Sequence, residues 1–82
     1  MYKIELSKIA EKQLYKLGKE IQERIIVTLE RIRVRPYAFV VKLVGSTYFR
    51  LRVGDYRVIL DIQENRLVIF VIELGHRRNI YK

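Results

Sequence analysis

The sequence contains no cysteine, a single histidine and a single proline among its 82 residues. The lack of cysteine excludes disulfide bonds and thiolate metal sites, and it is typical of proteins from a reducing compartment. A single histidine excludes the paired-histidine acid–base chemistry of many nucleases. Because the carboxylates are scattered along the chain as well, the sequence indicates no metal site and no cofactor site.

Long hydrophobic runs are also missing. No stretch approaches the roughly 18 consecutive apolar residues that a membrane-spanning helix needs. The first residues, Met1 to Glu5, do not combine a basic leader with an apolar block, so they do not resemble a secretion signal. Since half of the residues are hydrophobic and charges interrupt them every few positions, we expect one soluble domain over residues 1–82, located in the cytoplasm.

Acidic residues are scarce relative to basic ones, because 17 Lys and Arg stand against 9 Asp and Glu and give a formal net charge of +8. This excess favours a polyanionic partner, of which nucleic acid is one class and acidic proteins or membrane surfaces are others. After Lys42 nearly all of the basic residues are arginines. The planar guanidinium group of arginine suits bidentate binding of phosphate, so the second half of the chain is the better candidate for nucleic-acid contacts.

The first half of the sequence predicts a short strand followed by two helices. Residues 2–6 alternate between apolar and charged side chains, and Ser7 behind them is a good helix N-cap. Apolar residues at helical spacing follow, with Gly18 as the expected C-cap of the first helix. A second apolar stripe over residues 19–33 predicts another helix, which Pro36 ends. The two helices form a hairpin whose apolar faces need a sheet to cover.

The second half of the sequence predicts strands. The secondary structure of residues 37–46 stays open: residues 39–41 could begin a strand or form a connection packed under the helices, and Gly45 and Ser46 indicate a turn. Three segments rich in Val, Ile, Tyr and Phe predict strands over residues 48–53, 56–62 and 67–74. The order is βααβββ, which is an α+β fold with a helical hairpin packed on one face of a curved, mostly antiparallel sheet.

Gly54 and Asp55 connect the first two of these strands, and glycine at the first central position is typical of a type II′ hairpin. This turn predicts that Arg52 lies opposite Arg57. The same register gives the pairs Arg50 with Ile59 and Tyr48 with Asp61. The helices should cover the other face, which carries Phe49, Leu51, Val53, Tyr56, Val58, Leu60 and Ile62.

Like charges directly opposite each other on a sheet are destabilising by a few tenths to about 1 kcal/mol. Stability alone would not select Arg52 opposite Arg57, so the arrangement favours an anionic ligand such as the phosphate backbone. The alternative is that Asp55, Asp61 and Glu73 disperse the charge and that the arginines are only solvated.

The face assignment of the last strand depends on the length of the preceding turn. A three-residue turn over residues 63–65 would direct toward the core Val68, Phe70, Ile72 and Leu74, whereas a four-residue turn would invert the pattern. We favour the shorter turn because it buries Phe70 and leaves Glu73 outside. It also leads Gly75 and Arg77 onto the open face beside Arg57.

Three segments resemble the RelE/ParE toxin superfamily, and its RelE branch in particular. They are Lys42-Leu43-Val44-Gly45, the hairpin over residues 49–59, and Gly75-His76-Arg77-Arg78-Asn79-Ile80-Tyr81. The resemblance spans the chain and implies the toxin of a type II toxin–antitoxin system. It further implies a ribosome-dependent endoribonuclease that cleaves mRNA in the ribosomal A site without a metal, and a RelB-type antitoxin as protein partner.

The resemblance also implies roles for individual residues. Arg57, Arg77 and Tyr81 take the catalytic positions, and the RNA-binding positions fall on Lys42, Arg50, Arg52, His76 and Arg78. Arginine has a pKa above 12 and cannot act as an ordinary base, but it can hold a phosphate as negative charge develops. Tyr81 could be the base, since neighbouring guanidinium groups favour the ionised phenol. The alternatives are that Tyr81 only anchors the chain end and that His76 and Arg78 are ordinary surface residues.

Two other functions remain open. The hairpin segment is shared by both branches of the superfamily, so a ParE-like toxin that inhibits DNA gyrase without any chemistry is the first alternative. The second is a basic RNA-binding module that does not cleave. The arginine and tyrosine in the last segment favour the RelE branch.

Overall fold

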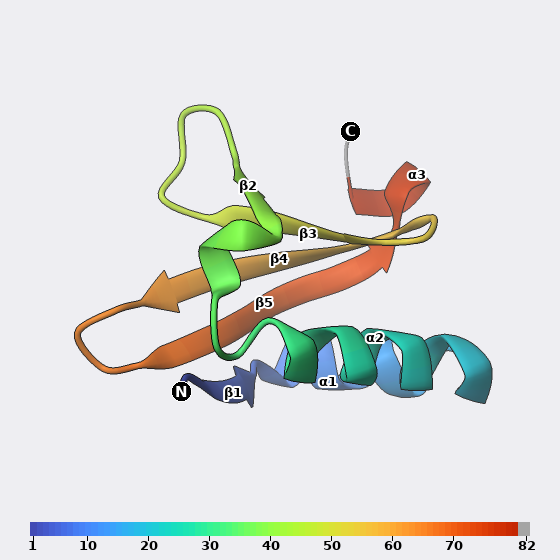
Figure 1. The fold of residues 1–82 in the computed structure, drawn as a ribbon. Coiled ribbons are helices and arrows are strands. Elements are labelled where there is room, and N and C mark those ends of the chain that lie inside the picture. Colours follow the sequence, from blue (N-terminus) through green and yellow to red (C-terminus); the bar gives the residue numbers. More distant parts are fainter. Residues whose placement is uncertain (81–82) are drawn as a thin grey trace.

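The computed structural model describes residues 1–80, which form a five-stranded sheet with helices. In chain order the elements are β1 (Lys3–Leu6), α1 (Lys8–Tyr15), α2 (Lys19–Arg31), the 3₁₀ helix η1 (Pro36–Ala38), β2 (Val40–Lys42), β3 (Phe49–Val53), β4 (Tyr56–Gln63), β5 (Val68–His76) and α3 (Arg77–Ile80) (Figure 1). The α+β class and the six expected elements are confirmed. Strand β2 and the short helix α3 are additions to the predicted order.

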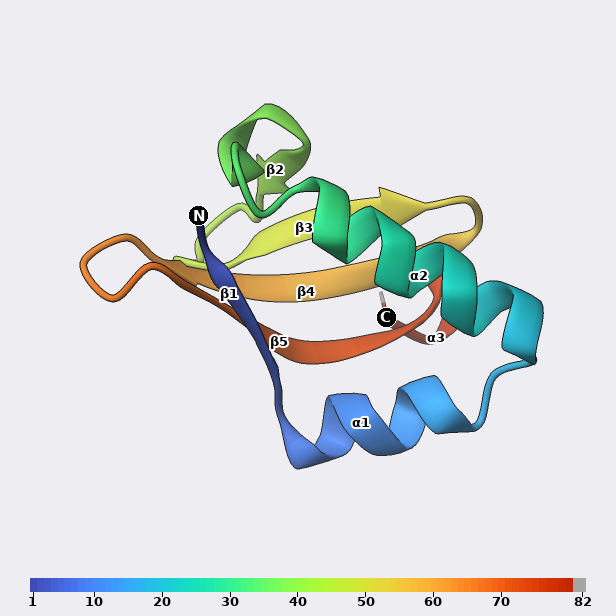
Figure 2. The same ribbon diagram turned by 60° about the horizontal axis from the view of Figure 1, so that its bottom comes forward.

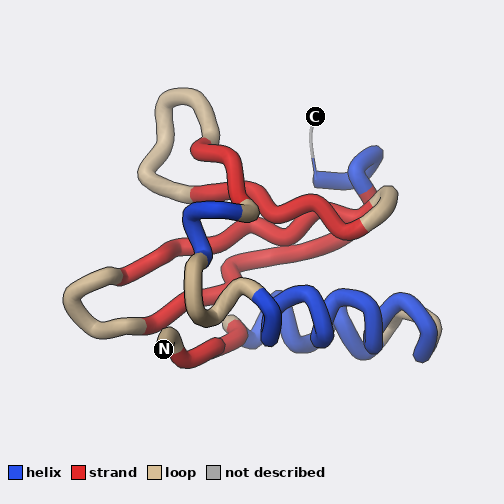
Figure 3. Tube along the Cα trace, in the orientation of Figure 1, coloured by secondary structure: helices blue, strands red, loops and turns tan. Residues whose placement is uncertain are grey.

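The strands lie in the order β1-β5-β4-β3-β2, and every neighbouring pair is antiparallel except β1 with β5. Helices α1 and α2 lie together against one face of the twisted sheet, while α3 lies on the other side (Figures 1 and 2). The tube in Figure 3 shows that the helices and the sheet form separate layers. We call the face that α1 and α2 leave uncovered the open face.

The core lies between the helical hairpin and the sheet. Its most deeply buried large side chains come from both layers and include Ile25, Ile32, Leu60, Ile69 and Leu74. Removing each such side chain from water contributes about 1.5–3 kcal/mol. The apolar stripe of α2 and the predicted inner face of β3 and β4 both contribute to this core, with Phe49 and Tyr56 partly buried at its margin.

Helices α1 and α2 begin directly after Ser7 and Gly18, two residues that the sequence analysis predicted to be helix caps. Ser7 has the predicted role and Gly18 has a different one. The Ser7 hydroxyl accepts a hydrogen bond from the backbone N–H of Ala10 at 3.0 Å, as expected of an N-cap. Gly18 was expected to end the first helix, and this was wrong: α1 ends at Tyr15 with Lys16 as its C-cap, and Gly18 is the extended N-cap residue of α2 (φ −60°, ψ 151°). Within residues 1–80, no helix is long and apolar enough to cross a membrane.

The segment whose structure the sequence left open forms η1 and β2. Pro36 occupies the first turn of η1, where its fixed φ is favourable and its missing N–H costs nothing. The chain then adds β2 to the edge of β3, with Val41 paired to Arg50 and Lys42 to Phe49. Strand β3 begins at Phe49, so the expected pair of Tyr48 with Asp61 does not form.

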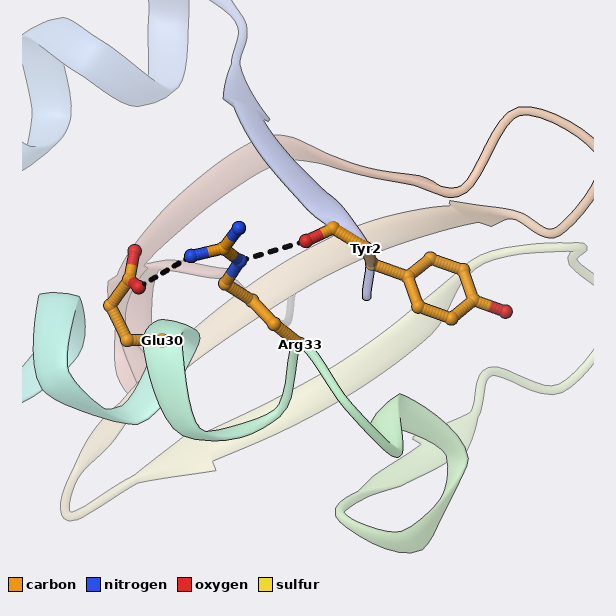
Figure 4. A network of polar contacts seen from close by, with 3 residues as sticks. All are labelled: Tyr2, Glu30 and Arg33. Carbon is orange, nitrogen blue, oxygen red and sulfur yellow. Dashed lines mark hydrogen bonds and ion pairs between the residues drawn. The ribbon is translucent and has the colours of Figure 1, made fainter.

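Arg33, two residues after the end of α2, holds the N-terminal segment in place through hydrogen bonds. The Nε of Arg33 donates to the backbone carbonyl of Tyr2 at 2.7 Å, and its Nη1 donates to Oε1 of Glu30 at 2.8 Å (Figure 4). The backbone N–H of Tyr2 in turn donates to the carbonyl of Arg33 at 2.9 Å. This arginine therefore has a structural role.

The expected faces of β5 were wrong over its first half. The turn between β4 and β5 has four residues, Glu64 to Leu67, and Gln63 pairs with Val68. Leu67 adopts φ 54°, which lets the longer turn close. As a result Ile69 and Val71 enter the core and Phe70 faces the open side. The shorter turn was favoured because it would bury Phe70, but the longer turn buries Ile69 and Val71 in its place.

A β-bulge in the middle of β5 then shifts the alternation of core-facing and open-facing residues by one position. Ile59 pairs with Glu73 but Leu60 pairs with Val71, so Ile72 is an extra residue on β5. Because one inserted residue reverses which face follows, Leu74 returns to the core. The second half of β5 therefore has the predicted faces, with Glu73 and Gly75 on the open face.

Candidate nucleic-acid interface

The β3–β4 hairpin positions the arginines as predicted. Gly54 has φ 60°, and Asp55 is not among the residues with positive φ, which agrees with a type II′ turn. The register pairs Val53 with Tyr56 and Arg52 with Arg57. The two arginines therefore lie opposite each other on the open face.

A third strand and α3 extend this row. Gly75 of β5 pairs with Arg57 on the side away from Arg52, so no side chain intervenes there. The backbone N–H of Arg77 donates to the carbonyl of Asp55 at 2.9 Å, which holds the start of α3 at the hairpin turn. We call Arg50, Arg52, Arg57 and Arg77 the arginine corner; Arg52 and Arg77 are exposed, while the other two are half-buried.

The arginine corner has the chemistry of an anion site. The Nε of Arg52 donates to the carbonyl of Gly54 at 3.3 Å, so its side chain lies along the turn. Guanidinium groups from two neighbouring strands and from α3 can contact adjacent phosphate oxygens, and each such contact releases counterions. Within residues 1–80, no group of three or more His, Asp or Glu side chains could hold a metal ion.

Ile59 occupies the open face beside the arginine corner, yet it is only 5% exposed and lies outside the core cluster. Arg50 and Glu73 flank it on the neighbouring strands. The aliphatic stems of such long side chains can cover an apolar residue while their charged ends stay in water. The open face is thus partly apolar at its centre and charged around it.

Lys42 and His76, two other residues predicted to bind RNA, are placed away from the arginine corner. Lys42 pairs with Phe49, and His76 pairs with Tyr56, so both share the face that the helices cover. The rings of His76 and Tyr56 meet edge to face with centroids 5.5 Å apart. Arg78 is exposed in α3, and its backbone N–H donates to Nδ1 of His76 at 3.3 Å.

The third predicted catalytic residue, Tyr81, lies outside the residues that the structure describes. Its predicted role as a base is therefore carried by the resemblance alone. Of the predicted catalytic set, the structure places Arg57 near the start of β4 and Arg77 at the start of α3, where its backbone is bonded to Asp55 of the hairpin turn.

Arg24 of α2 is a cation near the turn that the sequence analysis missed. A Cβ added at Gly54 would lie 3.3 Å from its Nη2 atom, so the guanidinium group packs against the glycine. Arg24 also lines a cleft of about 570 Å³ between α2 and β3, together with Arg52. No local signal in the sequence could have found it, since Arg24 and Gly54 are far apart along the chain.

The way in which the edge of β5 beyond β1 is satisfied was not predicted from the sequence either. Strand β1 pairs only as far as Val71, and side chains of α1 and its cap satisfy the edge beyond it. The hydroxyl of Ser7 donates to the carbonyl of Ile72 at 2.7 Å, and Oε1 of Gln13 accepts from the N–H of Leu74 at 2.7 Å. These two contacts hold the strand that leads into Gly75 and Arg77.

Tyr37 lies away from the arginine corner, and its phenol has a raised pKa. Partial burial, followed by a hydrogen bond to the Glu64 carboxylate and its charge, raises the pKa of Tyr37 to about 12. Its ring also meets Phe49 edge to face at 5.4 Å. The residue therefore ties η1 to the sheet, and its phenol is a poor candidate for a base.

The sequence profile of the family described as "ParE toxin of type II toxin-antitoxin system, parDE" matches residues 4–81. No curated protein sequence matches the chain significantly. The family match covers nearly the whole chain, so it assigns the chain to this family.

Solved structures agree with this assignment. RelE in the archaeal RelE–RelB complex from Pyrococcus horikoshii is similar with 29% identity and a TM-score of 0.81, covering 95% of this chain and 97% of that one. The intact E. coli RelBE complex matches with 27% identity, a TM-score of 0.78 and coverage of 93% and 96%. The RelBE2 complex from Mycobacterium tuberculosis, at 19% identity, a TM-score of 0.81 and coverage of 93% and 98%, supports the fold alone.

The helical hairpin on a mostly antiparallel sheet thus matches the fold of the RelE toxins, and the chain belongs to the RelE/ParE superfamily. Within it, the chain belongs to the ParE toxin family of type II toxin–antitoxin systems.

Proposed function

We propose that the protein is a RelE-type toxin, a ribosome-dependent endoribonuclease that cleaves mRNA in the A site. The observation that carries this proposal is the arginine corner, where Arg52 opposes Arg57 and Arg77 is held at the same turn. The similarity to RelE of P. horikoshii and E. coli supports it.

In the proposed reaction, the 2′-hydroxyl of the RNA attacks the adjacent phosphate and displaces the 5′-oxygen of the next nucleotide. Negative charge increases on the phosphate oxygens in the transition state. Arg57 and Arg77 stabilise that charge, while Arg50 and Arg52 bind the flanking backbone. A 2′,3′-cyclic phosphate and a free 5′-hydroxyl are the products.

The ionised phenolate of Tyr81 would take the proton from the 2′-hydroxyl, and the departing 5′-oxygen would take a proton from water to give the 5′-hydroxyl. A free tyrosine has a pKa of about 10, and nearby guanidinium groups favour its ionised form. A base that is scarcely ionised at neutral pH makes a weak intrinsic catalyst. This is compatible with an enzyme whose substrate is oriented by the ribosome, because positioning can contribute about 7–11 kcal/mol.

We further propose a RelB-type antitoxin as partner, because the P. horikoshii and E. coli relatives were solved as RelE–RelB and RelBE complexes. Charge complementarity with a net charge of +8 favours an acidic chain. Exposed apolar residues such as Ile9, Ile26 and Val27 on the helices would suit an amphipathic segment.

The test is cleavage of mRNA on translating ribosomes, with the message ends mapped after incubation. Arg57→Ala, Arg77→Ala and Tyr81→Phe should each suppress cleavage, whereas Arg31→Ala, an exposed arginine of α2, should leave it unchanged. Full activity in a folded Arg77→Ala/Tyr81→Phe double variant would sink the assignment.

The alternative is ParE-like inhibition of DNA gyrase, which the description of the matching family favours. A supercoiling assay with purified gyrase distinguishes the two functions. Inhibition of supercoiling without any cleavage of ribosome-bound mRNA would establish the alternative.

A further inference from the structure

The open face has a second charged row that the proposed function does not use. The register places Asp61 of β4, Phe70 of β5 and Glu5 of β1 side by side. Their strand neighbours Ile4, Leu60 and Ile69 contribute to the core, so these three side chains point to the open face. We call Asp61 and Glu5 the carboxylate row.

The carboxylate row and the arginine corner lie at opposite ends of the same face. Asp61 follows Arg57 by four residues on β4, which corresponds to about 13 Å along the strand. In the row between them, Arg50 lies on the β3 side and Glu73 on the β5 side of Ile59. The sign of the charge therefore changes diagonally across the face, from the β3–β4 hairpin to β1.

The Oδ2 of Asp61 accepts a hydrogen bond from Nε2 of Gln63 at 2.9 Å, which is a neutral partner. Lys3 lies one row further out, opposite Val68. Asp61 lies about 13 Å along β4 from Arg57, which exceeds the Debye length of about 8 Å at physiological salt. Arg50 is the arginine nearest to Asp61, as its diagonal neighbour across β3 at about 7–8 Å, so the sign of the charge changes between these two residues.

We propose that the carboxylate row confines bound RNA to the arginine corner by repelling the phosphates of any chain that extends across the open face. The inference rests on the proposed function, because it defines how much RNA backbone the same face accepts. Binding would then be restricted to a short single-stranded stretch that leaves the sheet at the hairpin end.

The experiment measures binding of the full chain to single-stranded RNA oligonucleotides of increasing length by fluorescence anisotropy, without ribosomes and over a range of salt concentrations. For the wild-type protein, affinity should stop rising once the oligonucleotide fills the arginine corner. For Asp61→Lys and Glu5→Lys, it should continue to rise with length. The slope of log K against log salt should steepen by about 0.7 for each phosphate gained.

Glu11→Lys is the matched control, because it changes the net charge equally at an exposed position on α1. Its slope and length dependence should equal those of the wild type. If Glu11→Lys and both open-face variants behave alike, the boundary is overturned and only net charge matters. Thermal melting shows whether each variant is folded, and two independent open-face positions protect the test against the loss of one.

The outcome is separable from that of the proposed function. A protein that binds RNA through the arginine corner but never cleaves ribosome-bound mRNA would overturn the nuclease and leave the boundary standing. A protein that cleaves mRNA while Asp61→Lys and Glu5→Lys retain the wild-type slope would overturn the boundary alone.

Discussion

The two faces of the sheet use alternate residues of the same strands for different purposes. On β4, Val58 and Leu60 are completely buried under the helices, while Arg57 and Asp61 point the other way. The pairs at the centre of the covered face, such as Leu51 with Val58 and Leu60 with Val71, are apolar, which stabilises the fold. The open face pairs Arg52 with Arg57, which costs stability.

Under the proposed function, this difference separates the residues that stabilise the fold from those that bind RNA. Pairing of Arg52 with Arg57 is unfavourable for stability by itself, and binding of a polyanion would explain why both arginines are present. The predictions below test whether substitutions on the two faces have independent effects.

The largest expected effect on stability comes from the covered face. Leu60→Ala removes a fully buried side chain of the core, so the free energy of unfolding should fall by about 2–5 kcal/mol. Urea denaturation followed by circular dichroism measures this loss. A decrease below about 1 kcal/mol, within the range of an ordinary surface substitution, would contradict the assignment of Leu60 to the core.

The largest expected effect on activity comes from the open face. Arg77→Ala should reduce cleavage of ribosome-bound mRNA by about 100- to 1,000-fold, the usual effect of removing one group that stabilises transition-state charge. Because its side chain is exposed, the free energy of unfolding should change by less than about 0.5 kcal/mol. Loss of activity with an equal loss of stability in denaturation experiments would mean that the two faces are coupled.

A smaller effect on stability is expected at the edge of β5, where Gln13 of α1 bonds to the backbone of Leu74. Gln13→Leu leaves the N–H of Leu74 without its acceptor and should cost about 1–3 kcal/mol of unfolding free energy. Gln13→Glu keeps an acceptor oxygen and serves as the control. If both variants unfold at the same urea concentration, the contact contributes nothing to holding β5.

The smallest effect has the opposite sign. Arg52→Gln removes one of two opposed charges and should raise the unfolding free energy by a few tenths to about 1 kcal/mol, while RNA binding weakens. Salt titration checks the cause, because the gain in stability should shrink as ionic strength rises. A loss of stability would show that the arginine pair is not a cost to the fold.

The parts that could be predicted are those specified by residues close together in the chain. Gly54 and Asp55 define a two-residue turn, and that turn alone determines that Arg52 opposes Arg57. Ser7 before an apolar helical stripe likewise defines the start of α1. In each case the structure depends on contacts within a few residues, which a local pattern contains.

Segments whose structure depends on distant partners were left open or missed. Strand β2 has only three residues, and it forms because they pair with the edge of β3. The bulge at Ile72 is held in part by the hydroxyl of Ser7, which is distant in sequence. The positions of Arg24 against Gly54 and of His76 against Tyr56 arise in the same way.

The sequence by itself determined the class of fold, the helical hairpin, the register of the central β-hairpin and the basic character of the open face. These follow from side-chain periodicity and turn chemistry, which act over a few residues. Only the tertiary structure decided which residues of β5 face the core, and how the arginine corner and the carboxylate row divide the open face. Those features depend on a turn length, a bulge and pairing between distant strands, because a single inserted residue reverses every face that follows it.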